Sequence, residues 1–392
     1  MERRSFIRLV GGGALALGAG TLGGCSTDYP AEAVAAWRGP GNEPDARKWA
    51  LAHAILAPNS HNRQPWVVDL REPNAIRLHV DRERLLPQTD PWFRQIVVSQ
   101  GTFLELLLMA LAERGVAARV ELFPDGEFAA RVVDDRPVAR VSWTPGAAPP
   151  PRDPLFAQVL RRRTAKVGYD TARRVDPAHV RALGDAMPAG APPHLAWGAT
   201  SDDARLPALR RLCIDSARVE VGTARTALES SRLMRIGPTE IARHRDGIAM
   251  MGVMPRVASA LGLFDRERAP EPGSSTFDQV MKRFVEHGDT AMGFVWITTD
   301  APAGATRSAE VWAGRAYVRQ HLQATALGLQ MHPMSQAPQE FPEMKPHYDA
   351  LRRLVLGPDA AGARVVQMFS RIGYCADQPH TPRRPVSDII RA

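Results

Sequence analysis

The sequence predicts an α+β fold that contains two similar units within one chain of 392 residues. First, helical and strand-like patterns alternate irregularly along both parts of the chain. Second, residues 144–154 consist mainly of Pro, Ala and Gly, which is the composition of a linker. Third, a helical pattern that ends in glycine and continues into a strand occurs at 101–115 and again at 314–328. This echo suggests two related units, although two such segments can also coincide by chance.

The first unit covers residues 46–143. Its first helix is expected over 45–55, with Asp45 as N-cap, and must end before Pro58. A strongly apolar helix is expected over 103–114, closed by Gly115. Alternating or β-rich runs bounded by turn residues predict the strands. These strands are expected at 67–70, 76–80, 119–123 and 138–141.

The second unit covers residues 155–392 and is richer in helical patterns. Its clearest strand is Gly-Phe-Val-Trp-Ile-Thr-Thr at 293–299, and a last strand is expected at 365–371. Residues 329–336 are expected to be extended and to lead into a loop. Between the helices, residues 233–275 are rich in Met, Gly and Pro and form a separate segment. Helices are expected at 155–163, 177–186, 204–232, 277–287 and 314–328.

The composition is that of a globular protein with a basic surface. Hydrophobic residues make up 44% and charged residues 23% of the chain, and the net charge is +8. Nucleic-acid binding is one interpretation of that charge. However, the basic residues are spread along the chain and form no dense block interleaved with aromatic residues. Small arginine clusters are better suited to a cofactor that carries a phosphate.

Cysteine and histidine provide little sign of a metal or redox centre. The three cysteines are Cys25, Cys213 and Cys375, with no CxxC motif and no Cys/His spacing typical of zinc. We therefore predict no metal site. A disulfide between Cys213 and Cys375 is possible in an oxidising compartment, but two free thiols are the simpler expectation.

The N-terminal residues 1–24 have the pattern of an export signal. Arg3-Arg4-Ser5-Phe6-Ile7 matches the twin-arginine pattern, and a short, glycine-rich apolar stretch follows. Leu-Gly-Gly at 22–24 precedes Cys25 as in a bacterial lipobox, so Cys25 is the predicted lipidation site. Residues 25–45 are expected to be a tether, and the mature protein is expected on the periplasmic side of the envelope. The alternative is a basic, apolar N-terminus without this role.

The loop 58–66 is the most informative segment for function. Two prolines bound it, and between them lie Asn59, Ser60, His61, Asn62 and Gln64. Amide side chains both donate and accept hydrogen bonds, which suits a heterocycle whose carbonyl and N–H groups alternate, as in flavin. The same residues could also form a well-capped surface loop.

Two basic segments are candidates for binding a phosphate group. Arg162, Arg163, Thr164 and Lys166 lie close together in 161–166, and Arg383 lies between prolines near the C-terminus. Guanidinium groups bind phosphate oxygens in a bidentate manner, and lysine adds a point charge. A solvated basic surface is the more common role of such runs.

Together, these segments resemble the nitroreductase superfamily. Ala-Pro-Asn-Ser-His-Asn-Arg-Gln-Pro-Trp at 57–66 is similar to the flavin loop of that superfamily, particularly of the Acg-type members with two fused halves. Residues 162–166, 328–336, 371–374 and 383–386 resemble further motifs of these proteins, in the expected order. The resemblance covers residues 46–392. It implies a mixed sheet flanked by helices, two halves that form a pseudo-dimer in a monomeric chain, and one site for flavin mononucleotide (FMN).

The resemblance also implies roles for individual residues. Thirteen residues would hold the phosphate, the ribityl chain and the ring of FMN. The nitrogen N5 of the ring would lie near residues 333–335. The sequence departs from the family pattern at His61 and Arg63, which are bulkier than the residues that many members have there. It also departs after Met334, where no acidic residue follows. The implied FMN-binding residues are Pro58, Asn59, Ser60, Asn62, Gln64, Arg162, Arg163, Thr164, Lys166, Pro333, Met334, Ser335 and Arg383.

Two functions remain open for such a flavin site. The first is an oxidoreductase that passes hydride or electrons from FMN to a nitro compound, a quinone or a similar small molecule. The second is a protein that sequesters FMN beneath a lid at 233–275, without turnover; an ordinary core insertion is the alternative for that segment. His61 is a possible acid, although a loop histidine is more often a hydrogen-bonding partner. A hydrolase is not supported, because the chain has no Gly-x-Ser-x-Gly motif.

Overall fold

The computed structural model describes residues 28–202, 204–262, 265–301, 306–358 and 362–391. The predicted export signal and the predicted lipidation site at Cys25 lie outside these residues. The described chain is an α+β protein with two four-stranded antiparallel sheets and a separate two-stranded parallel sheet.

The first sheet lies in the first predicted unit. Its strands follow the order β1-β2-β4-β3, and every neighbouring pair is antiparallel. Trp66, Val68, Ile76 and Leu78 are fully buried, because alternate residues of these strands face the helices. The bounds are β1 Trp66–Asp69, β2 Ala75–Val80, β3 Arg119–Leu122 and β4 Ala139–Ser142, with helices α1 Ala46–Ala54 and α2 Arg94–Glu113.

The second sheet lies in the second predicted unit. Its strands follow the order β5-β8-β10-β9, again with antiparallel neighbours. Strand β8 is buried along almost its whole length, and its first five residues form a continuous apolar run. The strands are β5 Leu195–Thr200, β8 Gly293–Asp300, β9 Gln330–Pro333 and β10 Arg364–Gly373. The helices are α3 Pro177–Asp185, α4 Leu206–Gly222, α5 Ala224–Arg232, α8 Ser275–Asp289, α9 Arg307–Ala326 and α10 Lys345–Leu356.

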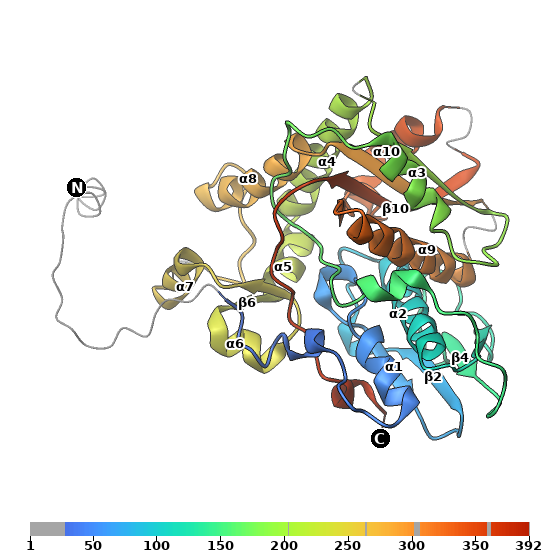
Figure 1. Ribbon diagram of the computed structural model, residues 1–392. Coiled ribbons are helices and arrows are strands. Elements are labelled where there is room, and N and C mark those ends of the chain that lie inside the picture. Colours follow the sequence, from blue (N-terminus) through green and yellow to red (C-terminus); the bar gives the residue numbers. More distant parts are fainter. Residues whose placement is uncertain (1–27, 203, 263–264, 302–305, 359–361, 392) are drawn as a thin grey trace, which may run out of the picture.

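Helices α2 and α9 join the two units at the centre of the molecule (Figure 1). Their backbones touch at Gly101 and Gly314. A Cβ atom on Gly101 would lie 2.0 Å from the carbonyl oxygen of Val311, and one on Gly314 would lie 2.0 Å from that of Val98. The contact is reciprocal, and the interval from Val98 to Val311 equals that from Gly101 to Gly314. These two glycines are the first residues of the similar segments 101–115 and 314–328 that the sequence contains.

Residues 233–275 form a small unit beside the main body. It contains strands β6 Met234–Ile236 and β7 Ile248–Met250, which pair in parallel, and helices α6 Gly237–His244 and α7 Val253–Ala260. In Figure 1 this unit projects from the side of the molecule, next to α8 and α5. Few of its side chains are fully buried, and none of those on α7 is.

The N-terminal end of the described chain packs against the first unit and the 233–275 segment, and the C-terminal tail packs against the first unit. The short 3₁₀ helix η1 (Ala35–Arg38) buries Trp37 in the first core, and Ala33 is fully buried. The tether expected over 25–45 is therefore wrong for its described part, because apolar residues at 33 and 37 anchor it. At the other end, the tail after β10 returns to the first sheet, where the backbone N–H of Arg391 donates to the oxygen of Val68.

The remaining differences from the expected elements have local causes. Helix α2 begins at Arg94 rather than at residue 103. Its first turns contain polar residues, so they show no apolar helical pattern in the sequence, although the rest of the fold buries them. Residues 155–163 form only the 3₁₀ helix η4 (Pro154–Gln158) and a turn. Strand β5 and helix α10 were not expected. The other 3₁₀ helices are η2 Ser60–Asn62, η3 Arg82–Arg84, η6 Pro342–Met344 and η7 Val386–Ile389.

Two further features concern membranes and redox chemistry. Helix α2 is the one described helix that is long and apolar enough to cross a membrane, but 89% of its apolar window is buried in the protein. It therefore serves as a core helix between the sheets. Cys213 and Cys375 are both free thiols, which agrees with the simpler of the two expectations.

Candidate functional site

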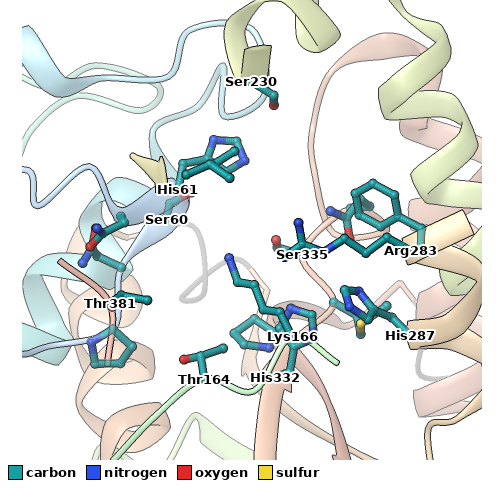
Figure 2. A pocket seen from close by; sticks show the side chains of 18 of the residues that line it. Ser60, His61, Thr164, Lys166, Ser230, Arg283, His287, His332, Ser335 and Thr381 are labelled. Atoms are coloured by element: carbon teal, nitrogen blue, oxygen red, sulfur yellow. The ribbon is translucent and has the colours of Figure 1, made fainter. Parts of the chain in front are cut away.

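A cavity of about 880 Å³ lies between the two units. Its walls come from the loop before β1, the first half of α2, the segment 162–166, the end of β9, the middle of β10, helix α8, the 233–275 segment and the C-terminal tail. Its volume is in the range of small-molecule and cofactor sites. Figure 2 shows how side chains from both units face this space, with Ser60 and His61 opposite Ser335 and His332.

The structure brings the predicted site residues to this cavity, with one exception. Gln64 is fully buried and does not line it. The Gln64 side chain donates to the backbone oxygen of Arg245 at 2.8 Å and accepts from the backbone N–H of Arg384 at 2.8 Å. It therefore links the loop to two other segments. The residues that line the cavity are Pro58, Asn59, Ser60, Asn62, Arg162, Arg163, Thr164, Lys166, Pro333, Met334, Ser335 and Arg383.

The loop 58–66 has an unusual backbone. His61, Asn62 and Gln64 all have positive φ angles of about 50°, which non-glycine residues rarely adopt. The Asn59 side chain holds the loop together, because its oxygen accepts from the Gln64 N–H at 2.7 Å and its nitrogen donates to the Ala57 oxygen. Such strain is typical of functional sites. The Asn59 amide predicted to contact a ligand is thus already used inside the loop.

One end of the cavity contains two buried guanidinium groups. Arg162 donates to the Leu56 oxygen at 2.8 Å, and Arg383 donates to the Asn62 side-chain oxygen at 2.7 Å. Within the described residues neither forms an ion pair with a carboxylate, and the Nε of each has no hydrogen-bond partner. Both guanidinium carbons lie within 6 Å of the centroid of the Trp37 ring.

Burial of two like charges is unfavourable unless an anion compensates them. Burial lowers the pKa of Arg162 to about 10. Burial, together with the neighbouring charge of Arg162, lowers that of Arg383. An anion between the two groups would remove this cost. This end of the cavity therefore has the chemistry of a site for phosphate or another strong anion.

The opposite part of the cavity carries a second cationic group. The Lys166 side chain points into the space that Figure 2 shows between Ser60 and Ser335. Burial, followed by the charges of Arg283 and Arg383, lowers the pKa of Lys166 to about 8. Arg371 holds the loop that carries Lys166, since it donates to the Val167 oxygen at 2.7 Å.

Four histidines line the cavity in neutral form. One of them is His380, whose pKa is lowered to about 4 by burial and by the charge of Arg163. Burial, followed by the charges of Lys166 and Arg63, lowers the pKa of His61 to about 4. Burial and the charge of Arg371 lower the pKa values of His287 and His332, that of His287 to about 3. His332 accepts from the Arg371 Nε at 3.0 Å. None of them adds positive charge near neutral pH, so the positive potential comes from the arginines and Lys166.

Glu220 is the one acidic side chain among the described residues that line the cavity. It is 4% exposed, and Gln339 donates to its Oε2 at 2.6 Å. Burial, opposed by the Gln339 hydrogen bond, raises the pKa of Glu220 to about 7. It can therefore hold or release a proton near neutral pH.

The backbone after β9 leaves one donor free at the cavity. The Met334 N–H donates to the Phe369 oxygen at 2.8 Å and so belongs to the sheet. For the next N–H, that of Ser335, no acceptor lies within hydrogen-bond distance in the described part of the chain. A ligand atom at this position would receive that hydrogen bond.

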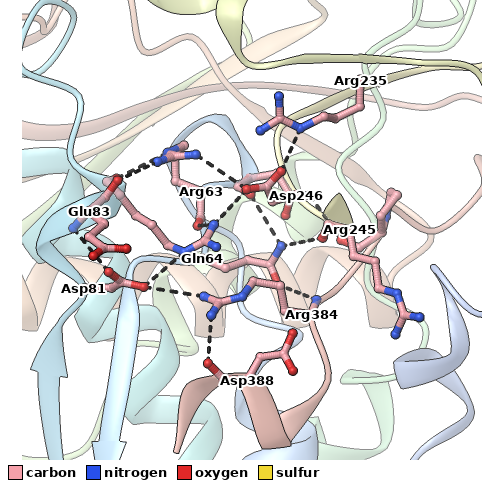
Figure 3. A network of polar contacts seen from close by, with 12 residues as sticks. Arg63, Gln64, Asp81, Glu83, Arg235, Arg245, Asp246, Arg384 and Asp388 are labelled. Atoms are coloured by element: carbon pink, nitrogen blue, oxygen red, sulfur yellow. Dashed lines mark hydrogen bonds and ion pairs between the residues drawn. The ribbon is translucent and has the colours of Figure 1, made fainter. Parts of the chain in front are cut away.

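The 233–275 segment closes one side of the cavity and is tied to the loop 58–66. Met234, Met250 and Met254 line the cavity. Asp246 forms ion pairs with Arg84 at 2.7 Å and with Arg235 at 2.9 Å, and a longer one with Arg63 at 3.5 Å. Figure 3 shows Asp246 at the centre of this network.

Several of these residues were missed by sequence reasoning. Trp37, Glu220, Arg283 and His287 come from helices or from the expected tether, and each is isolated from any motif in the sequence. A lone charged residue in an amphipathic helix gives no sign that it faces a cavity. Within the described residues no group of three or more His, Cys, Asp or Glu could hold a metal ion.

Comparison with known proteins shows partial sequence similarity to nitroreductases. No family model matches the chain. Over 128 residues, 32% of the chain, it is 32% identical to the candidate NAD(P)H nitroreductase Rv3131 of Mycobacterium tuberculosis. Over 81 residues, 21% of the chain, it is 36% identical to acg, another candidate NAD(P)H nitroreductase of that organism. These matches span 35% and 24% of the two relatives, so the chain spans about a third or less of their length.

Solved structures of nitroreductases also match the chain. The FMN-dependent nitroreductase NfnB from Mycobacterium smegmatis, in complex with NADPH, is 16% identical over 60% of this chain and 96% of that protein, with a TM-score of 0.37. A nitroreductase with bound FMN from Bacteroides fragilis is 13% identical over 59% of this chain and 94% of that protein, with a TM-score of 0.32.

Proposed function

We propose that this chain, a relative of the nitroreductase-like proteins, binds FMN in the cavity between its two units and acts as an oxidoreductase on small molecules. Sequence similarity to candidate nitroreductases supports the class of activity. The observation that carries the proposal is the pair of buried, uncompensated guanidinium groups of Arg162 and Arg383 at one end of a cavity of cofactor size.

The residues present fit FMN at both ends of the cavity. Arg162, Arg383 and the hydroxyl of Thr381 would hold the phosphate, which removes the cost of two buried cations. At the other end, Lys166 and the N–H of Ser335 would hold polar edges of the ring. When bound, FMN supplies the exchange of hydride or electrons, and this chain supplies the placement and the shielding from water. Glu220 is positioned to exchange a proton inside the cavity.

The two units are proposed to form an internal pseudo-dimer with one site. The reciprocal contact of Gly101 and Gly314 and the two sheets of equal size favour a duplicated origin. The cavity takes its phosphate-binding arginines from the second unit and its loop from the first, so both units contribute to it.

The location of the protein is also a proposal. The twin-arginine pattern at residues 3–7 and the lipobox-like residues before Cys25 favour export and a lipid anchor on the periplasmic side. Export in the folded state suits a protein that holds a noncovalent cofactor. Nitro compounds, quinones and similar acceptors remain the proposed substrates.

Substitution of Arg162 tests FMN binding. In Arg162→Met, we expect FMN affinity to fall roughly 10- to 100-fold, because a charge-assisted hydrogen bond to phosphate is lost. The apo-protein should be at least as stable as the wild type, because one of two repelling buried cations is gone. Fluorescence titration with FMN and thermal unfolding of the apo-protein measure the two effects.

Arg161→Met is the matched control, because Arg161 is an exposed neighbour that does not line the cavity. It should leave FMN affinity unchanged. A wild-type protein that is colourless and does not take up added FMN, or an Arg162→Met variant that binds FMN as tightly as the wild type, would contradict the proposal.

Sequestration of FMN without turnover is the second candidate function. The Asp246 network favours it, because it ties the 233–275 segment over the cavity to the loop 58–66. Anaerobic mixing of the yellow protein with NADH, NADPH or dithionite distinguishes the two functions. Loss of flavin absorbance with a nicotinamide donor, followed by reoxidation by a quinone, supports the oxidoreductase. A flavin that no donor bleaches supports sequestration.

A further inference from the structure

Helix α7 carries the largest group of exposed apolar side chains in the described part of the chain. The exposed fractions are 48% for Val253, 76% for Met254, 45% for Val257 and 66% for Leu261, which follows the helix. Trp92 and Val132, the other large apolar residues that are clearly exposed among the described residues, lie far from these in sequence. Contiguous apolar patches on a soluble surface usually mark interaction sites.

The exposed arc of α7 is distinct from the side that faces the cavity. At 100° per residue, Val253, Val257 and Leu261 lie on one arc, and Met254 lies at its edge. Pro255 and Ala258 follow on the next arc and line the cavity, as does Met254. The apolar arc of Val253, Val257 and Leu261 is therefore not explained by the ligand site.

A flanking side of α7, about 100° around the helix from the centre of the apolar arc, rests on the protein. Arg256 packs against Gly237 at the start of α6, where its Cγ would lie 3.7 Å from a Cβ atom on that glycine. This contact and the cavity-lining side chains of Pro255 and Ala258 leave the apolar arc exposed. Residues 253–260 contain no acidic side chain.

The described chain begins beside this same unit. Tyr29 and Ala33 pack with Ile241, Ala249 and Met251, which belong to α6, β7 and the residue that follows β7. Figure 1 shows the first described residues next to β6 and α6. Cys25, the proposed site of lipidation, precedes Asp28 by only three residues. An acyl chain on Cys25 would therefore hold the 233–275 unit close to a membrane.

The charge near α7 suits an anionic surface. Arg256 on α7, and Arg243 and Arg245 at the end of α6, form no ion pair within the described residues. The acidic residues of the segment are mostly paired with other arginines: Glu240 with Arg266, Glu271 with Arg268, and Glu267 with Arg232 of α5. Basic residues beside an apolar helix face are the pattern of helices that lie in the membrane interface.

We propose that the apolar arc of α7 (Val253, Val257 and Leu261) docks on the surface of an anionic lipid membrane. A helix of two turns buries little apolar area, so it binds lipid weakly when alone. Next to a lipid anchor it acts as the second membrane signal, and it fixes which side of the protein faces the bilayer. The wall of the cavity that contains Met254 then lies at the membrane. The proposal does not depend on which ligand the cavity holds.

Hydrogen exchange tests the docking directly in the full chain. Exchange of the backbone amides in 253–261 is measured with and without vesicles of phosphatidylcholine and phosphatidylglycerol. We expect anionic vesicles to slow exchange at least tenfold in this peptide, and not in β3 (Arg119–Leu122). Vesicles of phosphatidylcholine alone should have a smaller effect.

The variant Val253→Gln/Val257→Gln/Leu261→Gln should lose this protection, because Gln cannot enter the acyl region. Val132→Gln, an exposed apolar site elsewhere, is the matched control and should keep it. An unchanged spectrum of bound ligand in both variants shows that they fold. Equal exchange with and without vesicles overturns the proposal. So does protection that appears without lipid and grows with protein concentration, because that outcome identifies a second copy of the chain as the partner.

Discussion

At the scale of single residues, several positively charged side chains gather in the cavity although no described acidic partner accounts for their burial there. Arg162 and Arg383 are buried without a carboxylate among the described residues, and Lys166 lies in the same space. Arg94, which also lines the cavity, pairs with Glu340. Arg371, which does not line it, has no carboxylate partner among the described residues but donates to His332 and to backbone oxygens. Arg162 and Arg383 differ from both, because they lack a carboxylate partner and the Nε of each has no hydrogen-bond partner among the described residues. This difference is why the unpaired groups point to an anionic ligand.

Glu220 gives a prediction for the dependence of stability on pH. Its pKa is raised from 4.5 to about 7 in the folded protein, so the folded state keeps a proton that the unfolded state has lost. Stability from this group is present below pH 4.5 and is lost as the pH rises towards and above 7. We expect the free energy of unfolding of the wild type, relative to Glu220→Gln, to fall by on the order of 3 kcal/mol between pH 4.5 and 8.

Urea unfolding of both proteins across this range measures the difference. The comparison with Glu220→Gln isolates the group, because the other titrating residues are present in both proteins. A difference that stays constant with pH, or that grows in favour of the wild type at high pH, would show that Glu220 is ionised throughout.

At the scale of elements, the crossing of α2 and α9 fixes how the two units meet. A Cβ atom on Gly314 would overlap the Val98 carbonyl, and the neighbouring backbone cannot yield as a flexible side chain would. We expect Gly314→Ala to destabilise the protein by about 3 kcal/mol or more, because the helices must separate. Gly101→Ala should have a similar effect, since the contact is reciprocal.

Gly222→Ala is the matched control for this pair. Gly222 ends α4, and a Cβ atom there would meet its nearest neighbours at 3.9 Å. This change should be neutral or slightly stabilising, because alanine favours the helix. Thermal unfolding of the three variants measures the effects. If Gly314→Ala is tolerated as well as Gly222→Ala, the close crossing is not required.

The Asp246 network gives a second prediction at this scale. Burial opposes ionisation of Asp246, but hydrogen bonds and charges from Arg235 and Arg84 hold its pKa below the ordinary value. Its contribution to stability is therefore present at neutral pH and is lost only under acid conditions, below its ordinary pKa. In Asp246→Asn, three arginines lose their shared partner, and the 233–275 segment should loosen.

We expect Asp246→Asn to speed the release of bound FMN by roughly tenfold or more, because breaking a buried network costs a few kcal/mol. Glu267→Gln, which breaks an exposed pair with Arg232, should leave release unchanged. Stopped-flow fluorescence after dilution measures the release rates. Equal rates in all three proteins would mean that this network does not retain the cofactor.

At the scale of the whole molecule, the sequence predicts the parts of the site that form short motifs. The loop 58–66, the run 162–166 and Arg383 are candidates because polar or basic groups occur together there, whereas residues 333–335 are identified only through the family resemblance. The α+β class and most strands also follow from local patterns. Gln64 was misplaced because its distant partners, Arg245 and Arg384, determine where its amide points.

Other features depended on long-range packing and gave no local signal. Trp37 lies in a segment whose composition is that of a tether, yet its indole stacks on His380 at 4.2 Å, more than 340 residues away. Strand β5 has Gly and Thr among its residues and only two buried positions, so it lacks a clear alternation. The conformation of such elements is determined by the neighbouring strands and side chains against which they pack, and not by the pattern of their own residues.

The stoichiometry of FMN tests the arrangement of the whole chain. Each cavity needs the loop from the first unit and the arginines at 162 and 383, and the described part of the chain offers one cavity with this set. The tail returns from β10 to the first sheet within the same chain, so a second chain is not needed to complete the site. We therefore expect one FMN per chain, in a protein that remains monomeric when it binds the cofactor.

Light scattering after size exclusion, with absorbance at the protein and flavin bands, measures both quantities in one experiment in detergent. A dimer with two FMN molecules would mean that the sites are built between chains, as in two separate subunits. Removal of residues 382–392 tests whether the C-terminal tail belongs to the site. The truncation deletes Arg383 and the pairing of the tail with β1. The shortened chain should bind FMN at least tenfold more weakly. If its affinity is unchanged, the tail does not belong to the site, and the two units are held around the ligand by α2 and α9 alone.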